Sequence, residues 1–253
     1  MKLAYKEFGE GRPMIILHGL FGFSDNWVTH AKRFASYFKV YTIDLRNHGY
    51  SDWSDDFSYD LMVDDLKEFF DDHQIAKSIL IGHSMGGKVA MRFSQLYENS
   101  LEKLIVVDMG VKSYPLHHQH ILASFRNIDL SSLTARSQAE KLLSQFIDSE
   151  GVRQFLLKNL YWKDKGKLAW RLNFPVLERE MDEILKALPL QEVLVQTLFI
   201  RGELSNYIEE ADYSILEAYF PDSSIITISE AGHWVHAEAP EAFFDTVLGF
   251  ALR

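Results

Sequence analysis

The sequence predicts an α/β fold, with a doubly wound, mostly parallel sheet and a helical cap insertion. Short aliphatic and β-branched runs recur along the chain, and segments with helical periodicity lie between them. Runs that are apolar at consecutive positions suit strands buried on both faces, as in a parallel sheet covered by helices. The alternation of the two kinds of segment predicts the doubly wound order.

Six apolar runs are the predicted strands, and amphipathic helices are expected between them. In residues 60–73, for example, Leu61, Leu66, Phe69 and Phe70 fall near one helical face. A final apolar segment near the C-terminus predicts a closing helix. The predicted strands are Met14–Gly19, Val40–Asp44, Ser78–Ser84, Leu104–Gly110, Thr197–Gly202 and Ile225–Ser229, and the closing helix is Glu241–Leu252.

One long interval, from about residue 111 to residue 190, interrupts this alternation. It contains helical patterns, such as residues 139–147 and 178–188, and no convincing strand. An interval of this length is too long for a plain loop between two strands. We therefore expect a helical insertion that covers the carboxyl edge of the sheet.

Composition excludes several classes of function. The chain has 253 residues, of which 47% are hydrophobic and 25% charged, as in ordinary globular proteins. The formal net charge is −10 and no basic stripe stands out, which argues against a nucleic-acid partner. Because the chain has no cysteine, disulfides, thiolate metal sites and a cysteine nucleophile are excluded.

The N-terminal segment lacks the apolar core of a secretion signal. No segment approaches the ~18 apolar residues that a membrane-spanning helix needs. We therefore expect a soluble, cytoplasmic protein without a membrane partner. The sequence does not predict the oligomeric state, because no pattern identifies an interface.

The segment Leu80–Ala90 carries the pattern G-x-S-x-G, with Ser84 at its centre, between a predicted strand and a predicted helix. Glycines suit this position, because larger side chains would clash around a serine at a sharp strand-to-helix turn. Such a turn raises the hydroxyl above the sheet, and the helix N-terminus favours negative charge that develops there. Ser84 is the predicted nucleophile, and an ordinary helix-capping serine is the structural alternative.

A serine nucleophile needs a base, because its own pKa is too high for attack at neutral pH. His233 follows the last predicted strand, at the same edge of the sheet as the nucleophile, and is the predicted base. His236, three residues later, is the competitor. His83 is expected to shape the turn, and other histidines, the pair His117-His118 among them, are expected to be surface or packing residues.

The loop after the first predicted strand, within Ile16–Gly22, is a candidate oxyanion hole. Acyl transfer passes through an anionic tetrahedral state that needs preorganised N–H donors. The amide of Met85, directly after the nucleophile, and the amide of Leu20 are the predicted donors. Gly19 and Gly22 would let this backbone approach a substrate, although a plain glycine turn would use the same residues.

Taken together, the motifs HGLFG, DLRNHGYSD, GHSMGGK and GHWVHAE resemble the α/β-hydrolase superfamily across nearly the whole chain. They are most similar to those of the bacterial YbfF-type esterases. The resemblance implies an esterase that hydrolyses small acyl esters, with thioesters as a further option, through an acyl-serine intermediate. It implies no cofactor and no metal.

The resemblance also implies how the chain is divided into parts, and it implies that one of the motifs builds a loop rather than the catalytic site. The segment DLRNHGYS matches the family turn D-x-R-x-x-G-x-S, in which Asp44, Arg46 and Ser51 are expected to build a loop. The implied parts are a hydrolase core over residues 1–110, a helical cap over residues 111–190, and the rest of the core over residues 191–253.

The third member of a Ser-His-acid triad is missing from its usual place. In much of the superfamily it is an Asp in a G-x-x-D pattern after the penultimate strand, but here the pattern ends in Ser205. A serine carries no charge to stabilise the imidazolium that forms on His233. The acid must come from elsewhere, and the candidates are Glu203 in the same loop and Asp108.

Asp108 is the predicted acid, because it ends the neighbouring predicted strand at the edge where strand ends converge. The order Ser84, Asp108, His233 also keeps the superfamily order. The YbfF-type esterases share this departure. Glu203 remains the alternative, and Ser205 is expected to give at most a supporting hydrogen bond near His233.

Other functions are compatible with the same scaffold. Carbon–carbon bond hydrolases and perhydrolases use the same triad, whereas Ser84 argues against dehalogenases and epoxide hydrolases, which use an aspartate nucleophile. A non-catalytic ligand-binding protein of this fold is an alternative from another class. The sequence leaves open the physiological substrate and its acyl chain length.

Overall fold

The computed structural model describes residues 1–116, 119–164 and 166–253, so the pair His117-His118 lies outside the described residues. Seven strands form one sheet in the order β1-β3-β2-β4-β5-β8-β9. β1 pairs antiparallel with β3, and the other pairs in this sheet are parallel. The strands are β1 Tyr5–Phe8, β2 Pro13–Leu17, β3 Lys39–Ile43, β4 Ser78–His83, β5 Leu101–Val107, β8 Thr197–Gly202 and β9 Ser223–Ile228.

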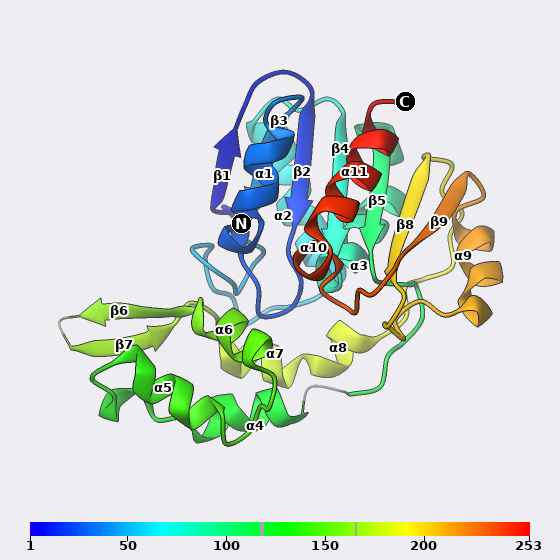
Figure 1. The fold of residues 1–253 in the computed structure, drawn as a ribbon. Helices are drawn as coiled ribbons and strands as arrows, with labels where there is room; N and C mark the ends of the chain where they lie inside the picture. The colour runs from blue at the N-terminus through cyan, green and yellow to red at the C-terminus, as the bar shows by residue number, and fades with distance from the viewer. Residues whose placement is uncertain (117–118, 165) are drawn as a thin grey trace.

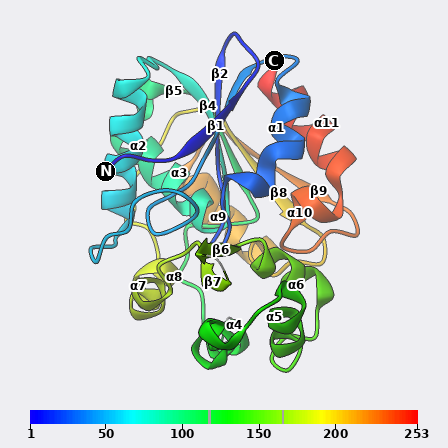
Figure 2. The ribbon, with the colours of Figure 1, turned by 90° about the vertical axis from the view of Figure 1, so that its left-hand side faces the viewer.

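Helices cover both faces of the sheet, as Figure 2 shows, with α2 and α3 on one side and α1 and α11 on the other. Successive side chains of a strand point to opposite faces, so each strand contributes side chains to the hydrophobic core on each face of the sheet. In β2, Ile15 and Leu17 join the core with α2 and α3, whereas Met14 and Ile16 join the core with α1 and α11. The core helices are α1 Val28–Phe34, α2 Tyr59–Asp72, α3 Met85–Tyr97, α9 Tyr213–Tyr219, α10 Val235–Glu238 and α11 Pro240–Ala251.

The segment between β5 and β8 lies below the carboxyl ends of the parallel strands (Figure 1). It is mainly helical, but it also contains an antiparallel pair of strands, in which Leu160 pairs with Trp170. The prediction that this interval has no strand was therefore wrong at the hairpin. Its elements are α4 Gln119–Asn127, α5 Arg136–Leu143, α6 Glu150–Leu157, β6 Leu160–Asp164, β7 Lys167–Trp170, α7 Phe174–Arg179 and α8 Met181–Leu185.

The predicted fold class is confirmed, and each of the six predicted strands coincides with a strand of the sheet. The edge strand β1 was not predicted. In α2 the predicted apolar face is shifted, because Met62 and Val63 are buried while Leu61 is only partly buried. Within the described part of the chain, no helix has the length and apolar character needed to cross a membrane.

Candidate active site

Ser84 lies at the turn between β4 and α3, with a backbone conformation that side chains rarely adopt (φ 54°, ψ −121°). The two flanking glycines make this turn possible. A Cβ on Gly82 would lie 2.2 Å from the carbonyl oxygen of Gly86, and a Cβ on Gly86 would lie 2.5 Å from that of His18. The strained, tightly packed turn holds the hydroxyl at the N-terminus of α3.

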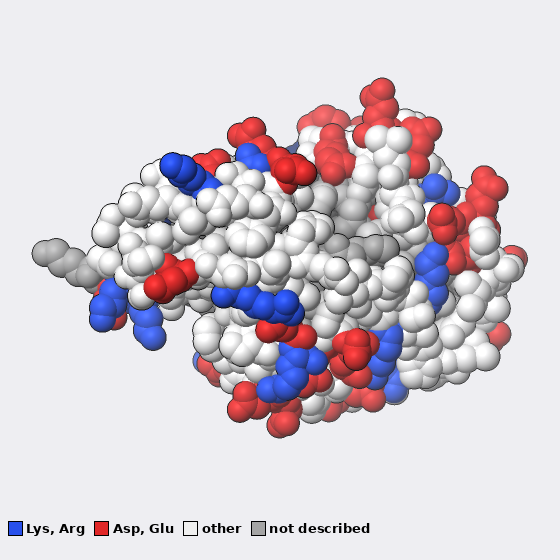
Figure 3. Space-filling view, turned by 90° about the horizontal axis from the view of Figure 1, so that it is seen from below, with Lys and Arg blue, Asp and Glu red and all other residues white. Residues whose placement is uncertain are grey.

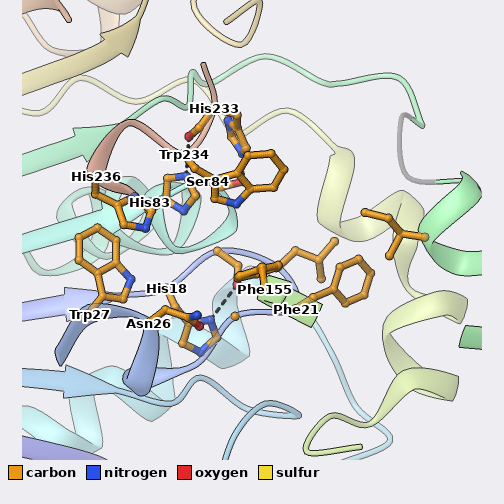
Figure 4. A pocket seen from close by; sticks show the side chains of 14 residues that line it. His18, Phe21, Asn26, Trp27, His83, Ser84, Phe155, His233, Trp234 and His236 are labelled. Atoms are coloured by element: carbon orange, nitrogen blue, oxygen red, sulfur yellow. Dashed lines mark hydrogen bonds between the residues drawn. The ribbon is translucent and has the colours of Figure 1, made fainter. Parts of the chain in front are cut away.

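Ser84, His233 and Asp108 form one hydrogen-bonded chain. The Ser84 hydroxyl donates to Nε2 of His233 over 2.9 Å. The opposite ring nitrogen, Nδ1, donates to Oδ2 of Asp108 over 2.8 Å. Figure 4 shows the Ser84 and His233 side chains in the wall of the same pocket. The structure thus brings together three side chains that the sequence places far apart.

Asp108 follows β5 directly and is fully buried. Its Oδ1 accepts a hydrogen bond of 3.1 Å from the amide of Gly202, and its Oδ2 accepts one from the hydroxyl of Ser205. With the His233 ring, this gives the carboxylate three donors, which suits a buried anion. The predicted supporting hydrogen bond of Ser205 is therefore made to the carboxylate.

Glu203 lies in the same loop as Ser205, but its carboxylate is bonded to another segment and not to His233. Its carboxylate accepts a hydrogen bond of 2.9 Å from the amide of Glu230, and the side chain is exposed. The structure therefore places Asp108, and not Glu203, against the ring of His233.

Leu20 and Met85, the predicted oxyanion donors, both line a cavity that Ser84 also lines. In the described parts of the chain, neither backbone N–H donates to a protein acceptor. Met85 is the first residue of α3, where amides have no partner within the helix. Both donors can therefore bind an oxygen of a ligand at Ser84.

Buried polar side chains hold the loop that carries Leu20. His48 accepts a hydrogen bond of 3.3 Å from the amide of Phe21, whose carbonyl accepts one of 2.7 Å from Asn159 in the insertion. Phe21 itself has a left-handed backbone (φ 61°). His18 accepts from the amide of Leu45 over 3.0 Å. The loop is thus fixed from both the core and the insertion.

Burial keeps these histidines neutral, as their acceptor roles require. Burial lowers the pKa of His18 to about 4. Burial, and then the neighbouring His18, lower the pKa of His48 to about 3. A neutral imidazole can donate from one nitrogen and accept at the other, which matches the bonds that both rings make.

The competing histidines have other positions. His83 donates from Nε2 to the carbonyl oxygen of His233 over 2.9 Å, which fixes the backbone of that residue. Burial lowers the pKa of His83 well below its usual value. His236 is buried and stacks on Trp27 at 4.1 Å between ring centroids, away from the Ser84 hydroxyl bond. These positions match the expected role of His83 and exclude His236 from the hydrogen-bonded chain.

Sequence reasoning missed Tyr207, whose ring stacks on that of His233 with centroids 3.8 Å apart and planes 18° apart. The Tyr114 hydroxyl donates to the carbonyl oxygen of Tyr207 over 2.8 Å. Tyr207 is two residues after Ser205, in the loop where much of the superfamily carries the triad acid. That loop therefore supports the histidine by stacking and by a hydrogen bond to its carboxylate partner.

The D-x-R-x-x-G-x-S turn is a structural loop, as expected. Asp44 accepts hydrogen bonds from the amides of Ser24 (2.6 Å) and Tyr50 (2.8 Å). Burial raises the pKa of this carboxyl. Arg46 forms a buried ion pair of 2.7 Å with Asp65. Among the described residues, no group of three or more His, Cys, Asp or Glu side chains could hold a metal ion.

Comparison with known proteins identifies relatives that match most of the chain. A family model described as "Alpha/beta hydrolase family" matches residues 14–246. The sn-1-specific diacylglycerol lipase ABHD11 of Danio rerio is 37% identical, over 99% of this chain and 82% of the relative. Esterase YbfF of Escherichia coli (strain K12) is 36% identical, over 91% of this chain and 89% of the relative.

A solved structure shows the same similarity. The structure named "Marine microorganism esterase" has a TM-score of 0.96 and 40% sequence identity, and the match covers 98% of this chain and 99% of that chain. The family model and these relatives span nearly the whole sequence. The chain therefore belongs to the alpha/beta hydrolase family.

Proposed function

We propose that this protein, a carboxylic ester hydrolase, cleaves small acyl esters through an acyl-serine intermediate on Ser84. The observation that carries the proposal is the unbroken chain of hydrogen bonds from Ser84 through His233 to Asp108. Relatives that span most of this sequence are named as esterases and lipases. The arrangement needs no cofactor, because the nucleophile, base, acid and oxyanion donors all come from the chain.

In the first half of the reaction, His233 takes the proton of Ser84 at Nε2 as Oγ attacks the ester carbonyl carbon. The carbonyl oxygen becomes an anion that the amides of Leu20 and Met85 stabilise. His233 then gives the proton to the leaving alcohol oxygen, and the acyl group stays on Ser84. Asp108 keeps the ring in the tautomer that accepts at Nε2 and stabilises the imidazolium.

In the second half, His233 removes a proton from water, which attacks the acyl carbon. The tetrahedral anion is held by the same two amides, and its collapse returns the proton from Nε2 to Ser84 and releases the carboxylic acid. Thioesters fit the same steps, because only the leaving atom changes. In this proposal residues 111–190 act as a cap that walls the site against water, while residues 1–110 and 191–253 supply the reacting groups.

The test of this function is the loss of ester hydrolysis in Ser84→Ala, measured with p-nitrophenyl acetate and the matching coenzyme A thioester. The expected fall in kcat is on the order of 10⁶, by analogy with serine protease triads. Intact-mass analysis after treatment with a p-nitrophenyl alkylphosphonate should show one adduct on the wild type and none on Ser84→Ala. A wild type that forms no adduct and cleaves no ester would contradict the proposal.

A further inference from the structure

Two different cavities border Ser84. The first, which we call the inner cavity, is walled mainly by Tyr59, Met109, Tyr114, Ile184, Leu185 and Tyr207. The second, the outer cavity, is walled by His233, Trp234, Ile121 and Phe155, among others. Leu20 borders both cavities. An ester whose carbonyl oxygen is held at the Leu20 amide would therefore place one of its two arms, the acyl chain or the alcohol part, in each cavity.

The inner cavity is lined mainly by apolar groups. The hydroxyl of Tyr59 donates to the carbonyl of Ile184 over 2.7 Å, and that of Tyr114 donates to the carbonyl of Tyr207. Because these hydroxyls are bonded within the protein, the surface left for a ligand consists of rings and aliphatic side chains. Behind this wall, Lys88 donates to the carbonyls of Leu185 and Lys186, which fixes the end of α8.

The outer cavity continues into a larger groove. The groove lies between α6 and α10 and shares Asn26, Phe155, Trp234 and His236 with the outer cavity. It extends to exposed side chains such as Gln154. Figure 4 shows Phe155 and Trp234 in the wall of the outer cavity. A long substituent can therefore run from Ser84 along this side to the surface.

His236 is a buried polar side chain in the wall of this passage, which Asn26 and Gln154 also line. Its side chain is 6% exposed, and among the described residues its Nδ1 is buried without a hydrogen-bond partner. A buried polar group without a partner is uncommon in folded proteins. Its place in the wall shared by the cavity and the groove points to a ligand on this side.

The position of the base decides which arm of an ester enters which cavity. The leaving oxygen must come within hydrogen-bond distance of Nε2 of His233, which gives it the proton. His233 is part of the wall of the outer cavity. On the inner side, Tyr207 lies flat on the ring of His233, with centroids 3.8 Å apart, and covers it. The leaving alcohol therefore belongs in the outer cavity, and the acyl group in the inner one.

We propose that the substrate is an ester of a short, apolar acyl group with a larger alcohol, which extends along the groove between α6 and α10. The proposal rests on the proposed function, because it places the two arms around the acyl-serine reaction at Ser84. It predicts that the enzyme discriminates by the length of the acyl chain and tolerates length in the alcohol.

Two isomeric esters test this directly. Octyl acetate and ethyl octanoate have the same composition, with the long chain on the alcohol in the first and on the acyl group in the second. The wild type should favour octyl acetate in kcat/KM by roughly tenfold or more, the scale of a pocket that rejects extra methylene groups. The kcat/KM for octyl acetate should also exceed that for ethyl acetate, because the groove binds the longer alcohol.

A matched pair of leucine variants checks the inner cavity. Leu185→Ala enlarges that cavity and should raise kcat/KM for ethyl octanoate, relative to kcat/KM for octyl acetate, by about tenfold. Leu142→Ala removes the same atoms from a half-buried leucine of α5 outside both cavities, and should leave this ratio unchanged. Circular dichroism of both variants controls for folding.

The outcomes separate the two proposals. Hydrolysis that depends on Ser84 but favours ethyl octanoate, or shows no preference, overturns the assignment of the arms and leaves the esterase reaction intact. An unchanged ratio in Leu185→Ala overturns it as well. If neither ester is cleaved and Ser84 takes up no phosphonate, the proposed function itself fails.

Discussion

At the scale of single residues, three hydrogen bonds hold the buried carboxylate of Asp108, one of them from the ring of His233. The strand-end position of Asp108 could be predicted from the sequence, because neighbouring parallel strands end at one edge. The support from Tyr207 and Asn159 could not, since both act through contacts between segments far apart in the chain. The sequence gives residue types and spacing, whereas stacking depends on how loops fold onto each other.

The two candidate acids form a matched test, because each can be changed to its amide. Asp108→Asn should lower kcat for p-nitrophenyl acetate by roughly 10⁴, because the amide cannot stabilise the imidazolium and favours the wrong tautomer of His233. Glu203→Gln should keep kcat within about twofold, since its carboxylate accepts a hydrogen bond from the exposed Glu230 and not from the ring of His233. A dead Glu203→Gln enzyme beside an active Asp108→Asn enzyme would reverse the assignment.

At the scale of elements, the sequence predicts six of the seven strands of the large sheet, including the edge strand β9, but neither β1 nor the hairpin of β6 and β7. β2, β4, β5 and β8 are buried at nearly every position, because both faces of the sheet are covered. β1 has four residues that alternate between exposed and half-buried positions, and β6 is mostly exposed. Their pairing depends on a neighbouring strand, so their own residues carry only a weak signal.

Lys88 connects two elements that the sequence does not relate. It lies in α3, is fully buried, and donates to the carbonyls of Leu185 and Lys186 at the end of α8. Its ammonium also lies 5.0 Å from the centre of the Tyr114 ring. Burial, and then Lys186, lower the pKa of Lys88 to about 7. The link between the nucleophile helix and the insertion therefore depends on pH.

The expected effect of Lys88 on stability follows from this depressed pKa. Between pH 10 and pH 7 the unfolded chain holds a proton on this amine that the folded chain binds only weakly. The free energy of unfolding should therefore fall as pH falls across this range, by at most about 1.4 kcal/mol per pH unit from this group, and level off below pH 7.

Urea unfolding of wild type and Lys88→Met at several pH values from 6 to 10 measures this effect. The variant keeps an unbranched side chain but cannot titrate, so its stability relative to wild type should rise as pH falls from 10 to 7. A difference between the two proteins that does not change with pH would contradict the depressed pKa. Lys67→Met, which changes a lysine paired with Asp71 on the surface of α2, is the control.

At the scale of the whole molecule, the site lies between the core and the insertion. The core supplies Ser84, Asp108 and His233, and the insertion supplies Phe155 and Leu185 to the walls of the two cavities. Figure 3, which views the molecule from the side of the insertion, shows acidic and basic side chains mixed on this face. In our proposal, the substrate is recognised by walls that come from both parts of the fold.

A ligand bound between these parts should stabilise both of them. A covalent octyl phosphonate ester on Ser84, formed with loss of p-nitrophenol, occupies the site and contacts the insertion. Hydrogen exchange followed by mass spectrometry should then slow in α6 and α8, because opening of these elements requires loss of ligand contacts. Exchange in β1, at the far edge of the sheet, should not change. The Ser84→Ala protein treated in the same way is the control, and protection confined to the core would show that the insertion takes no part in binding.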